Sequence, residues 1–203
     1  MRSNKPDNIT DEAWHKMKRG GPKLPHIGGQ NKVELETLVE WLKGQDIYRI
    51  LEIGSRDGIV LRYMAQNLPL VAEVASIDMP NGPWGYGGSE RSLLKQLTRL
   101  EQDGIRARYM LGDSKDAAQI RFAETYGPYD FIFIDGDHSY EGVLADYRNY
   151  GPIGRIVGFH DISHPEDSPA YGATKVWNEV RADRDEYLEI RSGGSYKGIG
   201  LML

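Results

Sequence analysis

The sequence contains no cysteine among its 203 residues. That absence excludes disulfide bonds, zinc–thiolate sites, iron–sulfur clusters and thiol nucleophiles. It also lacks any apolar run long enough to cross a bilayer, and its first residues lack the apolar core of a signal peptide. We therefore expect a cytoplasmic protein that has no membrane partner.

Positively charged residues are also fewer than negatively charged ones. The 25 Lys and Arg residues are outnumbered by 30 Asp and Glu residues, which gives a net charge of −5. Such a chain lacks the positive field that non-specific nucleic-acid binding needs, so we expect no nucleic-acid partner. Neither a G-x-S-x-G nor a P-loop pattern is present to indicate a hydrolase or an NTPase.

Composition changes near residue 31. Residues 1–30 are polar and rich in Gly and Pro, which is typical of an N-terminal arm, with one short helix near residues 13–18. Residues 31–203 have the length and apolar content of one globular domain. The arm could complete a substrate pocket or contact a second copy in a homo-oligomer, and the sequence leaves both open.

From residue 31 onward, helical and strand patterns alternate, beginning with an amphipathic helix closed by Gly44. The expected strands are residues 48–53, 71–77, 106–111, 131–134, 155–159, 187–191 and 198–203. The further helices are expected at residues 59–66, 90–102, 115–125, 140–150 and 173–181. Helical crossovers between strands imply a parallel sheet with helices on both faces.

The last two strands are joined by the short segment SGGSYK, which leaves no room for a helical crossover. They should therefore form an antiparallel hairpin. We predict an α/β fold with a Rossmann-like, doubly wound, mostly parallel sheet that ends in this C-terminal hairpin. Class I methyltransferases typically end in this way, and plain dinucleotide-binding domains usually do not.

A glycine-containing turn follows the first predicted strand, in the segment Glu52-Ile53-Gly54-Ser55-Arg56-Asp57-Gly58. A glycine at position 54 lets the backbone turn sharply and approach a ligand closely. The spacing departs from the G-x-G-x-x-G fingerprint of NAD-binding proteins. It resembles motif I of S-adenosylmethionine-dependent methyltransferases, which predicts cofactor binding by Glu52, Gly54, Ser55 and Gly58. A purely structural turn is the alternative.

The next two strands also end in residues that suit a nucleoside. Asp78, which ends the second strand, could accept hydrogen bonds from a ribose diol, or could serve as a turn residue before Pro80. At the end of the third strand, Asp113 and Ser114 could contact adenine or could cap the following helix. Open parallel sheets bind ligands at this carboxyl edge, so we predict that Asp78, Asp113 and Ser114 bind the cofactor.

Acidic residues also follow the fourth and fifth strands. Asp135 ends the apolar run FIFI, and His160-Asp161 follows the run IVGF. Adjacent strand ends lie about 5 Å apart. Two carboxylates at that distance repel each other unless a proton or a cation lies between them. Mg²⁺ or another divalent cation would suit these oxygen ligands.

The segments IDGDHSYEGVLADYRNY, GFHDI and YGATKVWNEV resemble a branch of small-molecule O-methyltransferases. This branch includes metal-dependent enzymes that methylate macrolide sugars and is related to cephalosporin hydroxylase-like proteins. The resemblance implies that Asp135 and Asp161 bind a metal, that Asp135 also borders the cofactor, and that His138 is the catalytic base. His160 replaces a carboxylate of some relatives, so it could be a metal ligand, a second base or a substrate contact.

The function that we expect is therefore metal-assisted methylation of a hydroxyl group on a small-molecule acceptor, such as a sugar or a natural product, with S-adenosylmethionine as donor. Two alternatives remain. Two histidines and a carboxylate could hold Fe(II) in an oxygenase, and a nucleoside-binding module could lack catalysis altogether. For His138 itself, the alternative is a structural residue at a helix start, hydrogen-bonded near Tyr140.

Several further residues receive structural interpretations. Asp137 is expected to be a turn or capping residue, Asp146 a salt-bridge partner on a helix, and Trp177 a packing residue against the sheet. His164 is a weaker candidate for the site. Residues 80–88, which include Trp84 and Tyr86, could form a lid or a surface loop.

Overall fold

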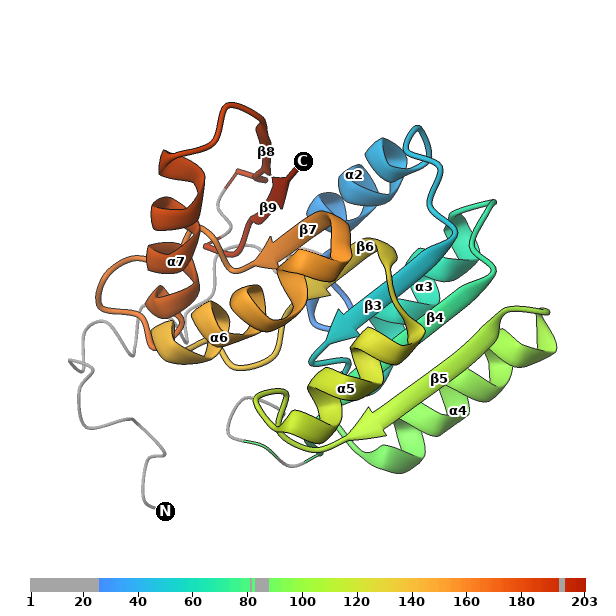
Figure 1. The fold of residues 1–203 in the computed structure, drawn as a ribbon. Helices are drawn as coiled ribbons and strands as arrows, with labels where there is room; N and C mark the ends of the chain where they lie inside the picture. Colours follow the sequence, from blue (N-terminus) through green and yellow to red (C-terminus); the bar gives the residue numbers. More distant parts are fainter. Residues whose placement is uncertain (1–25, 81, 83–87, 194–195) are drawn as a thin grey trace, which may run out of the picture.

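The structure is a computed structural model and describes residues 26–80, 82, 88–193 and 196–203. Strands and helices alternate along most of this range (Figure 1). The strands are β1 (His26–Ile27), β2 (Gln30–Asn31), β3 (Arg49–Ile53), β4 (Glu73–Asp78), β5 (Arg106–Leu111), β6 (Tyr129–Ile134), β7 (Gly154–His160), β8 (Tyr187–Ile190) and β9 (Ile199–Met202). The helices are α2 (Lys32–Leu42), α3 (Ile59–Asn67), α4 (Glu90–Gln102), α5 (Ala117–Tyr126), α6 (Tyr140–Tyr150), the short η1 (Gly151–Ile153) and α7 (Tyr171–Ala182).

Seven strands form one sheet in the order β5-β4-β3-β6-β7-β9-β8. Neighbouring strands from β5 to β7 are parallel, whereas β9 runs antiparallel to both β7 and β8. This topology confirms the predicted mostly parallel sheet and its C-terminal antiparallel hairpin. It also makes β6 and β7 neighbours, as the metal-site hypothesis required.

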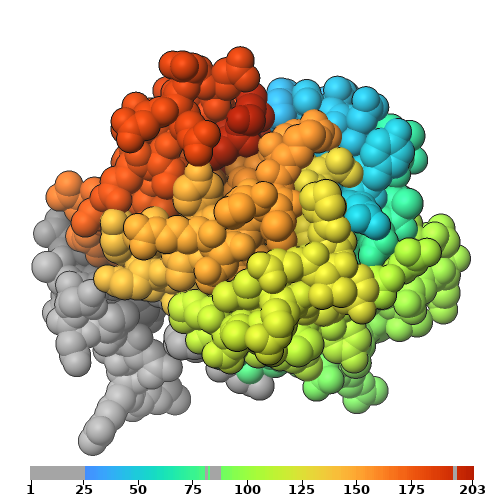
Figure 2. Space-filling model, viewed as in Figure 1, coloured from blue at the N-terminus to red at the C-terminus, as the bar shows by residue number. Residues whose placement is uncertain are grey.

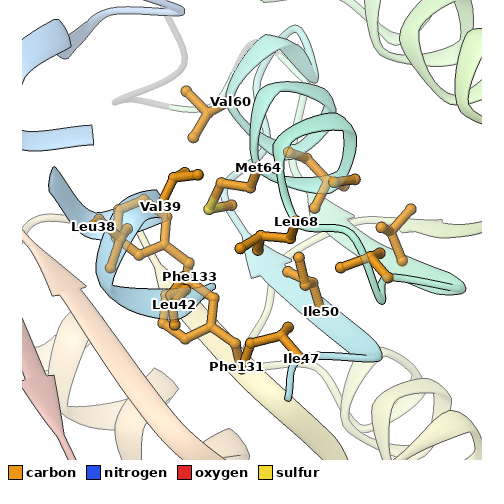
Figure 3. Packing of buried hydrophobic residues seen from close by; sticks show 14 of the residues in the cluster. Leu38, Val39, Leu42, Ile47, Ile50, Val60, Met64, Leu68, Phe131 and Phe133 are labelled. Carbon is orange, nitrogen blue, oxygen red and sulfur yellow. The ribbon is translucent and has the colours of Figure 1, made fainter. Parts of the chain in front are cut away.

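Helices cover both faces of the sheet. Successive side chains of a strand point to opposite faces, so the central strands contribute to two apolar clusters. Ile50 of β3 packs with helices α2, α3 and α4 in one apolar cluster, whereas the next residue, Leu51, packs in the other cluster, with α5, α6 and α7. Figure 3 shows the first cluster, where Met64 of α3 lies near Leu38 and Val39 of α2. Figure 2 shows the opposite face, with α5 in yellow-green beside α6 in orange.

Most element boundaries agree with the prediction to within about two residues, and the sequence signals explain several of them. Helix α2 begins after Asn31, whose side chain accepts hydrogen bonds from the backbone N–H groups of Val33 and Glu34. Helix α5 begins at Ala117 after Asp116, two residues later than expected. Ser114 therefore does not cap it, and the capping interpretation of that residue is wrong.

Residues 26–31 form a small antiparallel hairpin, β1–β2, directly before α2. The sequence assigned residues 26–30 to the N-terminal arm, and in the structure this part of the arm packs on the domain. The helix expected near residues 13–18 lies outside the described residues, as do Trp84 and Tyr86. Among the described helices, none is long and apolar enough to cross a membrane.

Candidate active site

A cavity of about 370 Å³ opens at the carboxyl edge of the parallel strands. That volume falls in the range of small-molecule sites. Ten of the eleven predicted site residues line it: Glu52, Gly54, Ser55, Asp78, Asp113, Ser114, Asp135, His138, His160 and Asp161. The exception is Gly58, which adopts a left-handed conformation at the start of α3 and faces Leu93 and Gln96.

Gly54 brings the ends of β3 and β6 into close contact. Its φ is +88°, and a Cβ atom added there would lie 2.3 Å from the backbone oxygen of Asp135. Glycine is therefore required both by the backbone conformation and by the space. The turn is stabilised by a hydrogen bond from the N–H of Gly54 to the carbonyl of Ile77, on β4.

Two acidic side chains border the motif I turn. Burial raises the pKa of Glu52 well above its ordinary value, with a smaller opposing effect from the Ser55 side chain. Asp78 accepts a hydrogen bond of 2.8 Å from the backbone N–H of Arg56. Burial also raises the pKa of Asp78, and the Arg56 N–H partly offsets this. Asp78 and the Gly54 turn therefore lie side by side, as a nucleoside cradle requires.

Two side chains of helix α6 form hydrogen bonds with the loop after β5. The hydroxyl of Ser114 donates a hydrogen bond of 2.6 Å to Asp146, and the hydroxyl of Tyr150 donates to the carbonyl of Ser114. Asp146 is fully buried, and its hydrogen-bond partner is a hydroxyl, so the salt bridge predicted for it is not found among the described residues. Asp113 accepts a hydrogen bond from the N–H of Lys115, in a turn, and contacts the Lys115 ammonium at 3.1 Å.

Beyond β6, two carboxylates and two imidazoles contact one another. Nδ1 of His160 lies 2.7 Å from Asp135 Oδ1 and 3.2 Å from Asp161 Oδ1. Nδ1 of His138 lies 2.6 Å from Asp161 Oδ2, and its Nε2 lies 3.6 Å from Asp135 Oδ1. The start of α6 is capped by Ser139, not by His138. His138 lies just before this helix and contacts the carboxylate cluster, and the choice between a catalytic and a structural role stays a prediction.

The cluster is electrostatically coupled. Burial alone would lower the pKa of His138, but the hydrogen bond with Asp161 and the charge of Asp135 raise it above its ordinary value. Burial alone would raise the pKa of Asp161, but the charge of His160 and the contacts with His138 and His164 hold it well below its ordinary value. Asp161 is therefore a carboxylate that orients a neighbouring imidazole.

Asp161 is held in an unusual backbone conformation, with a φ of +62°. Aspartate is among the residues that tolerate this left-handed region. Its carbonyl accepts a hydrogen bond of 2.9 Å from the hydroxyl of Thr174 on α7, which itself accepts from the N–H of His164. Nε2 of His164 lies 3.3 Å from Asp161 Oδ1. The segment YGATKVW of α7 thus fixes the acidic end of β7.

Two further predictions are confirmed, a turn role for Asp137 and a packing role for Trp177. Asp137 accepts a hydrogen bond from the N–H of Ser139, in a turn. Trp177 is fully buried against the sheet, with its ring 5.5 Å from that of Phe159.

The sequence left open whether the N-terminal arm completes the pocket, and the structure places the β1–β2 hairpin of that arm at the cavity. Gly28, Gly29 and Gln30 line the cavity, together with Lys197 from the segment before β9. The amide of Gln30 donates a hydrogen bond of 2.6 Å to Asp135, and Lys197 donates to the carbonyl of Gly29. A hairpin in a polar arm carries no motif for this role, and its position depends on long-range contacts.

The predicted metal ligands Asp135, His160 and Asp161 lie together, but their arrangement does not fit a cation. Among the residues that the structure describes, no group of three or more His, Asp or Glu side chains is arranged to hold a metal ion. The shortest contacts in the cluster, 2.6 and 2.7 Å, join imidazole nitrogens directly to carboxylate oxygens. These are direct contacts between side chains, although Nδ1 of His160 forms no hydrogen bond in the part of the chain that the structure describes.

Comparisons with known proteins agree with this fold and site. Residues 51–162 match the model of a methyltransferase domain family. An uncharacterized protein of Acanthamoeba polyphaga mimivirus is 30% identical over 168 residues, which cover 80% of this chain and 73% of that protein.

Two solved structures extend the comparison to nearly the whole chain. An O-methyltransferase from Bacillus cereus, in complex with SAH, has a TM-score of 0.64 at 17% identity and covers 95% of this chain and 90% of its own. The O-methyltransferase TomG from Streptomyces achromogenes, described as involved in tomaymycin synthesis and in complex with SAM, has a TM-score of 0.60 at 17% identity, covering 97% and 89%. The chain belongs to the methyltransferase domain family, and its fold is that of S-adenosylmethionine-dependent methyltransferases.

Proposed function

We propose that this methyltransferase transfers the methyl group of S-adenosylmethionine to a hydroxyl group of a small molecule, such as a sugar or a natural product. The observation that carries the proposal is the juxtaposition, in one cavity, of the Gly54–Asp78 turn and the His138–Asp161 pair. The first suits a nucleoside and the second suits proton removal from a hydroxyl.

In this proposal, the cofactor lies along the carboxyl edge of the sheet. Asp113 and Ser114 border the adenine, Asp78 accepts hydrogen bonds from the ribose, and the remainder of the cofactor lies beside the Gly54 turn, which lines the same cavity. This direction brings the sulfonium toward the β6–β7 cluster. The two O-methyltransferases of similar fold that were solved with SAM or SAH support the presence of this cofactor in the site.

Methyl transfer needs an acceptor aligned with the sulfonium and a base for its proton. The bond between sulfur and the methyl carbon breaks as the bond between the acceptor oxygen and that carbon forms. The hydroxyl proton passes to neutral His138, and S-adenosylhomocysteine leaves. Asp161, 2.6 Å from Nδ1, holds the imidazole and stabilises its protonated form.

Dependence on Mg²⁺ or another divalent cation stays a prediction from the sequence, and the steps above involve only the side chains. We expect the comparison of transfer rates with EDTA and with added Mg²⁺ to decide it. A rate that Mg²⁺ restores after EDTA treatment would require the cluster to open around a cation. An unchanged rate would leave proton removal to His138 alone.

The decisive experiment combines calorimetry with a transfer assay. Titration with S-adenosylhomocysteine should give one bound molecule per chain, and S-adenosylmethionine incubated with a panel of sugar, phenolic and polyketide hydroxyl compounds should yield S-adenosylhomocysteine. Binding without transfer to any compound would favour a non-catalytic nucleoside-binding module. No binding at all would overturn the proposal.

A further inference from the structure

In the side-chain amide of Gln30, the nitrogen forms a hydrogen bond and the oxygen has no partner among the described residues. It is 4% exposed and lines the cavity from β2. Its Nε2 donates a hydrogen bond of 2.6 Å to Asp135 Oδ2. In this contact the amide nitrogen is the donor and the carboxylate oxygen the acceptor. Oε1 is therefore a pure acceptor, and among the described residues it has no hydrogen-bond partner.

The hairpin that carries Gln30 is firmly attached on both sides. Arg56 donates a hydrogen bond of 2.8 Å to the carbonyl of Gly28, and Lys197 donates one of 2.6 Å to the carbonyl of Gly29. These two hydrogen bonds fix the backbone just before Gln30 and so limit the movement of Gln30 itself. An unmatched acceptor that is buried and held in place is unfavourable unless a ligand or an ordered water supplies the donor.

The order of the strands in the sheet indicates which part of the cofactor supplies the hydrogen-bond donor for Oε1 of Gln30. If adenine lies at β5 and ribose at Asp78 of β4, the rest of the cofactor extends over Gly54 of β3 toward Asp135 of β6. Gln30 contacts Asp135, so it lies at that end of the cavity. The remaining part of S-adenosylmethionine and of S-adenosylhomocysteine is an amino acid, whose ammonium carries three donors and a positive charge.

We propose that Oε1 of Gln30 accepts a hydrogen bond from the α-ammonium group of the bound cofactor, beside the Asp135 carboxylate. This inference rests on the proposed function, because it assumes that the cavity holds S-adenosylmethionine. Gln30 then distinguishes the complete cofactor from nucleosides that lack the amino acid. The β1–β2 hairpin is accordingly part of the cofactor site in this proposal.

The test compares two ligands on purified full-length protein by calorimetry. S-adenosylhomocysteine carries the ammonium, whereas 5′-methylthioadenosine has the same adenosine and thioether without the amino acid. In Gln30→Met, which keeps the length and removes both polar atoms, affinity for S-adenosylhomocysteine should fall about tenfold or more, the effect of one hydrogen bond to a charged group. Affinity for 5′-methylthioadenosine should stay unchanged.

A second variant separates the acceptor from its effect on Asp135. Gln30→Glu keeps an acceptor oxygen at the same distance along the side chain but cannot donate to Asp135 when ionised. It should bind S-adenosylhomocysteine more tightly than Gln30→Met does. Equal losses for both ligands in Gln30→Met, no loss for either, or a Glu variant as weak as the Met variant would overturn the inference. Failure of the unmodified protein to bind S-adenosylhomocysteine would instead overturn the proposed function.

Discussion

At the scale of single residues, His138 is distinguished by its contacts with two carboxylates in the cavity. Replacing His138 by Ala removes the proposed base but touches none of the groups at Asp78 or Asp113. We expect turnover to fall by about 10²–10⁴-fold, the usual contribution of a positioned base. Affinity for S-adenosylhomocysteine should stay nearly unchanged, as calorimetry would measure.

Asp161→Asn is the companion variant for this prediction. It should also reduce turnover, because an amide does not hold and stabilise the His138 imidazolium as a carboxylate does. Equal losses of turnover and of cofactor affinity in His138→Ala would show that the imidazole has a structural role.

Asp146 gives a prediction about pH. Burial raises the pKa of its carboxyl from 3.8 to about 7, against a smaller opposing effect of the Ser114 hydroxyl. Between these values the folded protein keeps a proton that the unfolded chain releases, so this contribution to stability is complete below pH 3.8 and is lost as pH rises through 7. Over the whole window it amounts to about 4 kcal/mol at 1.36 kcal/mol for each pKa unit.

The variant Asp146→Asn keeps the oxygen that accepts from Ser114 and cannot ionise. Its free energy of unfolding relative to the unmodified protein should therefore increase as pH rises from about 4 to 7.5 and then level off. Urea denaturation of both proteins across this range measures the difference. A difference that is independent of pH would contradict the raised pKa.

Which residues could be predicted from the sequence depends on how far apart the contacts are. Asp78, Asp135 and Asp161 follow directly after apolar runs, so their place at the ends of parallel strands could be read locally. Asp146 was predicted to be a salt-bridge partner on a helix, whereas its partner in the structure is Ser114, 32 positions away. Gln30 meets Asp135 across 105 positions, and no local pattern encodes that contact.

At the scale of elements, the turn between β3 and α3 depends on Gly54. Replacement by Ala adds left-handed strain of about 1–2 kcal/mol and a clash with the backbone of Asp135, for a further 1–3 kcal/mol. Gly104→Ala is the matched control, because its φ is +83° but a Cβ there would meet no atom within 4 Å.

We therefore expect Gly54→Ala to lower the free energy of unfolding more than Gly104→Ala does, and to weaken binding of S-adenosylhomocysteine, which Gly104→Ala should leave unchanged. Thermal unfolding and calorimetry measure these two effects. Similar effects of both variants on stability and binding would show that the close approach to Asp135 is unimportant.

The elements themselves were largely predictable because the central strands β3, β6 and β7 are mainly apolar runs and the helices carry apolar faces. The parallel direction of the main strands and the antiparallel final pair followed from the crossover rules and the short final connection, whereas the order β5-β4-β3-β6-β7-β9-β8 was not predicted. Helix starts were less accurate where a local cap was expected and absent, as at α5. The β1–β2 hairpin was missed because its two-residue strands have no periodicity to detect.

At the scale of the whole molecule, cofactor binding should stabilise the fold, since the cavity is built from strands β3 to β7 and from the hairpin. With S-adenosylhomocysteine at 100 times its Kd, the free energy of unfolding should rise by about 2.7 kcal/mol. For a chain of this size, that corresponds to an increase in Tm of roughly 5–10 °C. NAD should give no such increase, because the Gly54–Gly58 spacing departs from the dinucleotide fingerprint.

The central claim is that one rim of the sheet holds the nucleoside of S-adenosylmethionine next to a carboxylate–imidazole cluster. A crystal structure of the complex with S-adenosylhomocysteine tests it most directly. The account predicts the ribose hydroxyls on Asp78, the adenine beside Asp113, and the sulfur facing His138. A ligand bound elsewhere, or one whose sulfur points away from the Asp135–Asp161 cluster, would contradict it.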